Sequence, residues 1–246
     1  MNAIIKKEFN SYFTSPIGYI VIAAFFAFAG FYFYITCLIA NSANLSYTFS
    51  NLFIITIFLI PILTMRIFSE EKKQKTDVAL FTSPVKLSYV VLGKFIAALS
   101  IFSICISINL IFAFIISFFS KLNIASVFGN FLGLFLLSSA LISIAIFLSS
   151  LTENQIIAAV SSISVGLFIM LLDTLANIIQ SKFISNIFSK LSFMSRYNNF
   201  TLGIINLSDI VFFLSICAIF LFLTVRVFVF WNFFLWQISY VCSIKA

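Results

Sequence analysis

The sequence predicts an all-α integral membrane protein with six transmembrane helices. Three observations carry this prediction: a scarcity of charge, six apolar runs of membrane length, and an uneven distribution of lysine and arginine along the chain. Of the 246 residues, 63% are hydrophobic and only 9% are charged. A soluble domain carries roughly 25% charged residues, so this chain has too few charges to cover a surface that faces water.

Six apolar runs reach, or come close to, the length that crosses the hydrocarbon core, which takes about 20 residues in a helix that rises about 1.5 Å per residue. Pro61 falls inside the second run, and a membrane helix tolerates proline where its neighbours satisfy the freed backbone groups. The predicted spans are 17–40, 52–68, 95–119, 127–149, 156–176 and 210–225.

The basic residues predict the orientation, because lysine and arginine gather in the cytoplasmic loops of membrane proteins. With a cytoplasmic N-terminus, ten of the 14 basic residues lie inside and four lie outside. The inverted orientation violates the rule. We therefore expect a multi-pass protein of the inner or plasma membrane with its N-terminus in the cytoplasm.

Segments outside the spans carry patterns of their own. In residues 1–15, apolar residues share one helical face and Lys6, Lys7 and Glu8 lie largely opposite, which favours a short helix in the cytoplasmic interface. The cytoplasmic loop 69–94 is rich in charge, whereas the tail 227–246 is apolar and atypical for its position. In the external loop 177–208, apolar residues at helical spacing predict one or two amphipathic helices that dip into the outer leaflet; these residues are Phe183, Ile184, Ile187, Phe188 and Leu191.

Short motifs indicate where helices begin and where they pack. The sequence at 13–17 recurs in similar form at 81–85, and in both copies a serine before a proline suits an N-cap followed by the first helical position. Gly129 and Gly133 form a GxxxG pattern, and small residues recur at the same spacing in the first and fifth spans. Such spacing lets membrane helices approach closely. Packing within one subunit and a dimer face both remain open.

The chain lacks the catalytic and nucleotide-binding motifs that we searched for. It contains no histidine and no GxxxxGK[ST], HExxH or GxSxG sequence, and none of its four cysteines forms a CxxC pair. Asp173 is the one acid that we place within membrane reach among the spans, where it fits either a functional role or a solvated helix end. We therefore expect no enzyme activity, metal or cofactor on this chain. We also expect no nucleic-acid partner, because the basic residues lie between apolar runs.

The first cytoplasmic loop contains two predicted short helices. Ser69 can cap a helix whose first turn carries Glu70 and Glu71 and whose lysines follow, an order that suits the helix dipole. Thr76 and Asp77 can start a second, apolar helix. A partner-docking surface and an ordinary solvated loop both fit this pattern.

Four segments of the sequence resemble the ABC-2 type transporter permeases, especially the gliding-motility-type group. The first is Lys-Lys-Glu-Phe at 6–9, followed by Ser-Pro-Ile-Gly-Tyr at 15–19. The second is Leu-Thr-Met-Arg-Ile-Phe-Ser-Glu-Glu-Lys at 63–72. The others are Thr-Ser-Pro-Val at 82–85 with Leu-Gly-Lys-Phe at 92–95, and Gly-Ile-Ile-Asn-Leu-Ser-Asp at 203–209. The similarity covers about residues 1–226, and the chain departs from the family pattern at Lys75, Val78 and Asn206.

The resemblance implies an N-terminal interfacial helix, six spans and a coupling helix in the first cytoplasmic loop. That helix would contact a separate ABC ATP-binding subunit, which would carry ATP and magnesium, and two permease subunits would pair with two such ATPases. The residues implied to meet the ATPase are Glu70, Glu71, Thr76, Leu80, Phe81 and Pro84.

We therefore expect the permease subunit of an ATP-driven ABC-2 type exporter. A non-transporting membrane anchor or an immunity-type module is the alternative, because it would share all of the hydropathy pattern. An intramembrane enzyme is disfavoured by the lack of histidine and of paired polar residues deep in the spans.

Overall fold

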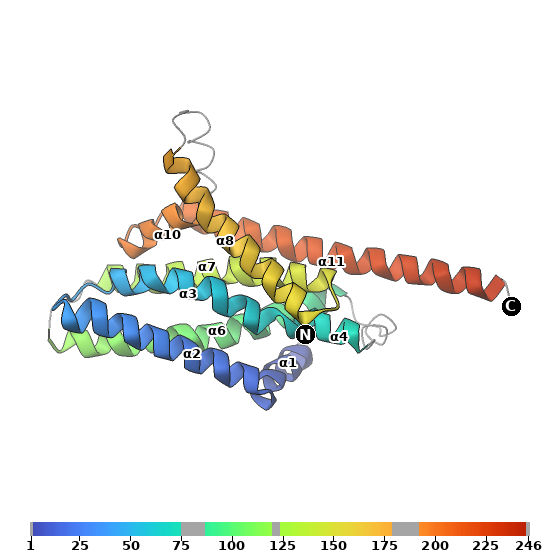
Figure 1. Cartoon of the computed structure of the whole chain (residues 1–246), viewed down its shortest axis with the longest axis horizontal. Helices are drawn as coiled ribbons and strands as arrows, with labels where there is room; N and C mark the ends of the chain where they lie inside the picture. Colours follow the sequence, from blue (N-terminus) through green and yellow to red (C-terminus); the bar gives the residue numbers. More distant parts are fainter. Residues whose placement is uncertain (1, 75–86, 120–123, 179–191, 245–246) are drawn as a thin grey trace.

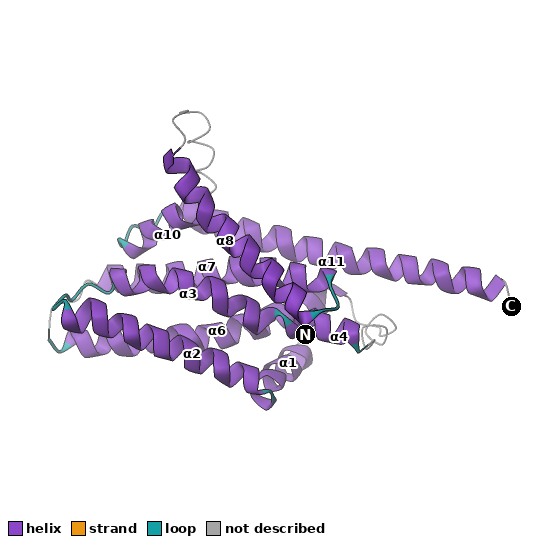
Figure 2. Cartoon of the chain, in the orientation of Figure 1, coloured by secondary structure: helices purple, strands orange, loops and turns teal. Residues whose placement is uncertain are grey.

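The chain forms a bundle of helices in the computed structural model, which describes residues 2–74, 87–119, 124–178 and 192–244 (Figure 1). Across these ranges there is no β-strand (Figure 2). The helices are α1 (Asn2–Thr14), α2 (Pro16–Phe33) with a π-helical continuation η1 (Tyr34–Ile39), α3 (Ser46–Thr64), α4 (Arg66–Lys73), α6 (Leu87–Ser117), α7 (Ile124–Leu151), α8 (Gln155–Ile178), α10 (Phe193–Thr201) and α11 (Leu207–Ile244).

Six helices in the described residues are long and apolar enough to cross a membrane, which confirms the predicted number of spans. The second and third begin earlier than predicted, because polar residues before the apolar runs continue the helices. Thr48 and Lys94 are such residues, and each is buried against partners within the chain. The observed helices are Pro16–Ile39, Ser46–Lys73, Leu87–Ser117, Ile124–Leu151, Gln155–Leu172 and Leu207–Val229.

Helix α7 is the centre of the bundle. In the most apolar stretch of α7, 72% of the residues are buried within the chain, whereas in that of α11 only 17% of the residues are buried. Helices α3, α4, α6, α8, α10 and α11 all pack against α7. The side chains that fill this core are mostly aromatic and branched aliphatic residues, among them Phe25, Phe53, Phe102 and Phe213. The outer helices therefore expose apolar surface, as six membrane-spanning helices require.

Different short helices close the two ends of the bundle, which we call the α4 end and the α10 end. Helix α1 packs on α2 and α6 at the α4 end, and α10 packs on α7, α8 and α3 at the other end. In α10, Tyr197 and Phe200 are completely buried, and the Tyr197 hydroxyl donates a hydrogen bond to the Phe49 carbonyl at 2.7 Å. This part of the segment predicted as the external loop thus turns its aromatic side chains into the bundle. The apolar residues predicted at 183–191 lie outside the described residues.

The predicted start of the first span is confirmed in its details. Ser15 is the N-cap of α2, its hydroxyl accepts a hydrogen bond from the Ile17 amide at 3.3 Å, and Pro16 occupies the first helical position. A proline costs nothing there, because the amide that it lacks has no partner within the helix. The second copy of the motif, at 81–85, lies outside the described residues.

The GxxxG glycines of α7 are explained by packing within the chain. A Cβ atom at Gly133 would lie 2.5 Å from the Phe200 Cβ, and one at Gly129 would lie 2.8 Å from the Phe200 carbonyl oxygen. Gly166 of α8 meets Ile57 of α3 in the same way, at 2.6 Å. By contrast, Ala23 and Ala27 of α2 are exposed on the chain. The small residues of α7 and α8 thus serve close contact inside one subunit.

Replacing Gly133 with alanine will destabilise the protein, since the new methyl group overlaps Phe200 at the contact between α7 and α10. Overpacking of this kind costs about 1–3 kcal/mol. Gly30→Ala is the matched control, because Gly30 is also helical and a Cβ there has no neighbour within 4 Å. We expect thermal unfolding in detergent to show a lower midpoint for Gly133→Ala and an unchanged or higher midpoint for Gly30→Ala. Equal midpoints for the two variants would contradict this account of the packing.

Candidate functional site

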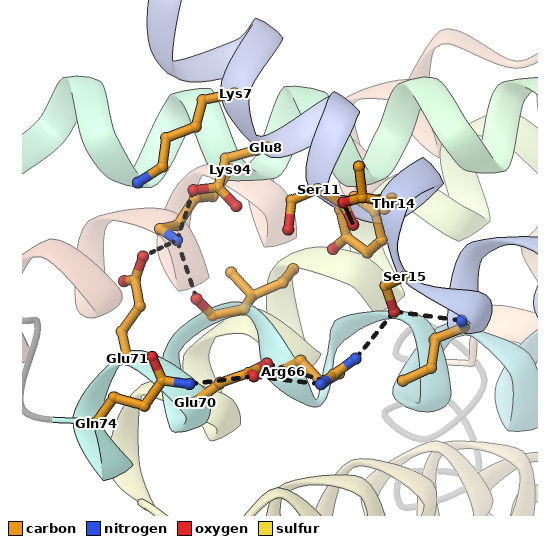
Figure 3. A pocket seen from close by; sticks show the side chains of 13 residues that line it. Lys7, Glu8, Ser11, Thr14, Ser15, Arg66, Glu70, Glu71, Gln74 and Lys94 are labelled. Atoms are coloured by element: carbon orange, nitrogen blue, oxygen red, sulfur yellow. Dashed lines mark hydrogen bonds and ion pairs between the residues drawn. The ribbon is translucent and has the colours of Figure 1, made fainter.

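The α4 end of the bundle contains a cleft of about 470 Å³ between α1, α4 and α6 (Figure 3). Charged side chains from all three helices line it, and they include Lys7, Glu8, Glu70, Glu71 and Lys94. The helices meet here because α1 crosses the start of α6, while α4 continues α3 past Met65. A charged cleft at the end of an apolar bundle is the feature of the described chain that most needs a physical explanation.

Lys94 is the central residue of this site. Its side chain is only 2% exposed, and its Nζ donates to Glu8 Oε1 at 3.0 Å, to Glu71 Oε1 at 2.7 Å and to the Ile67 carbonyl at 3.0 Å. The three contacts use all three protons of a lysine ammonium group. Because Glu8 belongs to α1 and Glu71 to α4, one buried cation on α6 ties three helices together.

The surroundings of Lys94 raise the strength of these contacts. The Phe68 ring lies 5.1 Å from the Lys94 Nζ, within reach of a cation–π contact, and the two carboxylates are 15% and 20% exposed. A charge that is taken out of water needs partners of good geometry to offset its desolvation. We infer that the α1–α4–α6 contact holds as a unit, because Glu8 and Glu71 share the Lys94 ammonium group, whose removal would leave two acids facing each other without their ion-pair partner.

Arg66 fixes the start of α4 to the start of α2. Its Nη1 donates to the Ser15 hydroxyl at 2.9 Å, and its Nε and Nη2 contact the two Glu70 oxygens at 2.9 and 3.2 Å. Ser15 thus caps α2 and accepts from Arg66 at once. Both side chains of the Arg66–Glu70 pair are 33% exposed, so water screens this pair and its energy is small.

The opposite side of α4 is fixed to α7 and α11. Lys72 is buried, donates to the Ser150 carbonyl at the end of α7, and lies 5.8 Å from the Phe228 ring of α11. The Ser149 hydroxyl accepts from the Phe68 amide and donates to the Met65 carbonyl. Helix α4 is therefore connected to α1, α2 and α6 on one side and to α7 and α11 on the other, although it has only eight residues.

The start of α4 differs from the prediction. Ser69 was expected to cap the helix, but α4 begins at Arg66, and Met65 is its N-cap residue without a side-chain hydrogen bond. The Ser69 hydroxyl instead donates back to the Met65 carbonyl inside the helix. The reason is that α4 follows α3 with only Met65 between them, and the Ser149 hydroxyl of α7 accepts from the Phe68 and Ser69 amides in place of a capping side chain.

Tyr12 of α1 brings a buried hydroxyl to the cleft. Among the described residues this hydroxyl has no hydrogen-bond partner. Burial, and secondarily the negative charge of Glu8, raise the pKa of Tyr12 above its ordinary value. The hydroxyl therefore stays protonated at physiological pH and does not add a charge to the site.

The structure places two of the six predicted coupling residues. Glu70 and Glu71 lie in α4 and line the cleft, where their carboxylates contact Arg66 and Lys94. The predicted coupling residues Thr76, Leu80, Phe81 and Pro84 lie outside the described residues.

Sequence reasoning did not find the partners Glu8, Lys72 and Lys94. The sequence did contain one signal, a lysine at position 94 directly before an apolar run. A cation beside a membrane span needs an acidic partner within reach, so this lysine could have indicated a buried ion pair. Pairing it with Glu8, 86 residues away, required the tertiary structure.

A second buried charge network closes the α10 end. Asp209 is 4% exposed and accepts from Arg196 at 2.6 Å and from the Asn199 side chain at 2.9 Å. The Arg196 guanidinium also lies 4.2 Å from the Phe212 ring. Asp209 stands in the first turn of α11, where the helix dipole favours an acid. This network joins α10 to α11, and sequence reasoning missed it.

The part of the chain whose side chains the structure describes contains no cluster of metal-binding side chains and no exposed cysteine thiol. There, no three histidine, cysteine, aspartate or glutamate side chains gather to hold a metal ion. Cys37, Cys105 and Cys217 are buried free thiols. The side chain of Asp173 lies outside the described part of α8. The described geometry of the α4 end thus offers mechanical connection between helices, through ion pairs and hydrogen bonds.

A comparison with protein families finds no family model that matches the chain, and a comparison with curated proteins finds no match.

Replacing Lys94 with methionine will destabilise the α4 end, because Glu8 and Glu71 lose the buried cation that pairs with both of them. Breaking a buried ion pair from one side costs about 3 kcal/mol or more. We expect a clear fall in the thermal unfolding midpoint for Lys94→Met, and a partial recovery when Glu8→Gln and Glu71→Gln are added. Lys73→Met is the control, since Lys73 is exposed at the end of the same α4 helix that carries Glu71. If Lys94→Met and Lys73→Met unfold at the same temperature, the triad does not stabilise the bundle.

Proposed function

We propose that this chain is the membrane-spanning permease subunit of an ATP-driven ABC-2 type exporter in the inner or plasma membrane. The observation that carries the proposal is the fixation of α4 by α1, α2, α6, α7 and α11. Helix α4 leads directly into the segment that resembles the coupling loop of ABC-2 permeases. A force applied to that segment therefore reaches the bundle through α4.

The contacts of α4 give this force two routes. Lys94 transmits a force on Glu71 to α6 and, through Glu8, to α1. Lys72 and the backbone amides that bind Ser149 carry it to the end of α7, which packs against most of the bundle. A short helix held by buried ion pairs moves with its partners as one unit, because stretching any pair exposes a poorly solvated charge.

Within this proposal, the two glutamates of α4 serve mainly to position the loop. The carboxylates of Glu70 and Glu71 already bind Arg66 and Lys94, which sets the direction in which the chain leaves α4. The contact with the ATPase itself falls to the segment with Thr76, Leu80, Phe81 and Pro84. ATP and magnesium bind the partner, and its nucleotide-driven closure shifts the paired permeases between inward- and outward-facing states.

The proposal requires a cytoplasmic α4 end, and cysteine labelling in intact cells tests this. In a background without the four native cysteines, we expect Gln74→Cys to react with a membrane-impermeant maleimide only after permeabilisation. Asn44→Cys, in the exposed turn before α3, should react in intact cells. The opposite pattern would reverse the orientation and remove the coupling loop from the ATPase.

A partner ATPase should purify with the tagged chain from its native membranes, and reconstituted ATP hydrolysis should depend on the loop. We expect Leu80→Glu with Phe81→Glu to lower the recovered ATPase several-fold, because two charges replace the apolar contact. Glu153→Gln is the control, since it changes a charge in the short turn between α7 and α8 at the same end of the bundle.

The two tests separate the proposal from its alternative. A correctly oriented chain that purifies without any ATP-binding subunit would contradict the transporter and favour the non-transporting anchor. Equal ATPase recovery for the loop variant and for Glu153→Gln would place the contact elsewhere.

A further inference from the structure

Helix α11 continues far beyond the bundle that it packs against (Figure 1). Its side chains contact α7 and α6 along the span, and Phe228 is the last residue described as buried. Phe228 packs on Phe68 at 4.6 Å and lies beside Lys72, so it marks the level of the α4 end. Residues 229–244 of α11 extend past this level as helix.

The length of α11 exceeds what a bilayer accommodates in one crossing. Its 38 residues make a helix of about 57 Å, against roughly 30 Å of hydrocarbon. To fit entirely within the hydrocarbon, α11 would have to tilt by more than roughly 40° from the bilayer normal, the upper limit seen for transmembrane helices. Residues 207–226 alone span about 30 Å, so the rest of the helix lies beyond one crossing.

The composition of the continuing segment excludes a stable position in water. Residues 227–244 contain no charged side chain, and Arg226 and Lys245 flank them. Apolar residues fall on every side of this helix, whereas a helix that lies on a protein surface is apolar on one side only. A single neighbouring helix, such as that of a second copy, would leave most of these side chains in water.

We propose that residues 229–244 lie in the membrane interface at the α4 end, covered by lipid. The segment carries Trp231, Trp236 and Tyr240, residue types that gather at the level of the lipid headgroups. It is continuous with a helix whose outer face already exposes apolar residues along the span, among them Phe222. The proposal requires α11, which is one continuous helix in the structure, to bend in a bilayer just past Phe228, the last residue described as buried. This inference requires that the six helices span a membrane, and it does not depend on the transport proposal.

The tryptophans make the proposal directly measurable, because Trp231 and Trp236 are the only two in the chain. The experiment reconstitutes the full chain in phosphatidylcholine vesicles and records tryptophan emission. The vesicles carry bromines either near the headgroup end or near the methyl end of the acyl chains. We expect the shallow bromines to quench about twofold more strongly than the deep ones, and aqueous iodide to quench weakly.

Two control variants calibrate depth after both tryptophans are replaced with phenylalanine. Phe28→Trp places a probe at an exposed position near the middle of α2, where deep bromines should quench best. Glu153→Trp places a probe at an exposed turn, where iodide should quench best.

Three results would overturn the proposal. Iodide quenching as strong as that of Glu153→Trp means that the segment projects into water. A depth profile like that of Phe28→Trp means that the segment crosses the membrane as another span. Emission that neither bromine nor iodide quenches means that protein covers the tryptophans.

Discussion

The burial of one positive charge governs the α4 end of this protein. Lys94 stands on a helix that is long and apolar enough to cross a membrane, and its side chain is almost fully buried. The two carboxylates from α1 and α4, together with the Ile67 carbonyl, make this position tolerable. An amphipathic N-terminal helix and a short charged helix, each too short to be stable alone, thereby become fixed parts of the bundle.

Helix α7 packs against most of the bundle, and it combines small residues with serines whose hydroxyls bond within the helix. Gly129 and Gly133 admit α10 at close range, and the hydroxyls of Ser138, Ser139 and Ser143 donate to carbonyls within the helix itself. Its far end binds α4 through Ser149 and Ser150. One helix thus connects the cap at the α10 end with the charged site at the α4 end.

The number and approximate places of the spans were predictable, because a hydrocarbon slab imposes one length and one composition on each of them. The Ser15–Pro16 helix start was also predictable, since its chemistry is local. The charge networks were not. Lys94 and Asp209 find their partners through folding, and a single sequence does not show which acid meets which base. The misplaced cap at Ser69 has the same origin, because α3 and α4 share a turn that composition does not reveal.

The separations of these contacts along the chain set an order of assembly during synthesis. Glu8 and Lys94 are 86 residues apart, so the α4 end can form once the third apolar helix has entered the membrane. The α10 end forms later in synthesis, because its hydrogen bonds join residues that are farther apart in the sequence. Tyr197 and Phe49 are 148 residues apart, and Ser46 and Thr201 are 155 residues apart. The Lys94 contacts of the α4 end can therefore form while α2 and α3 are still uncapped at the other end, and α10 caps them only after most of the chain has been synthesised.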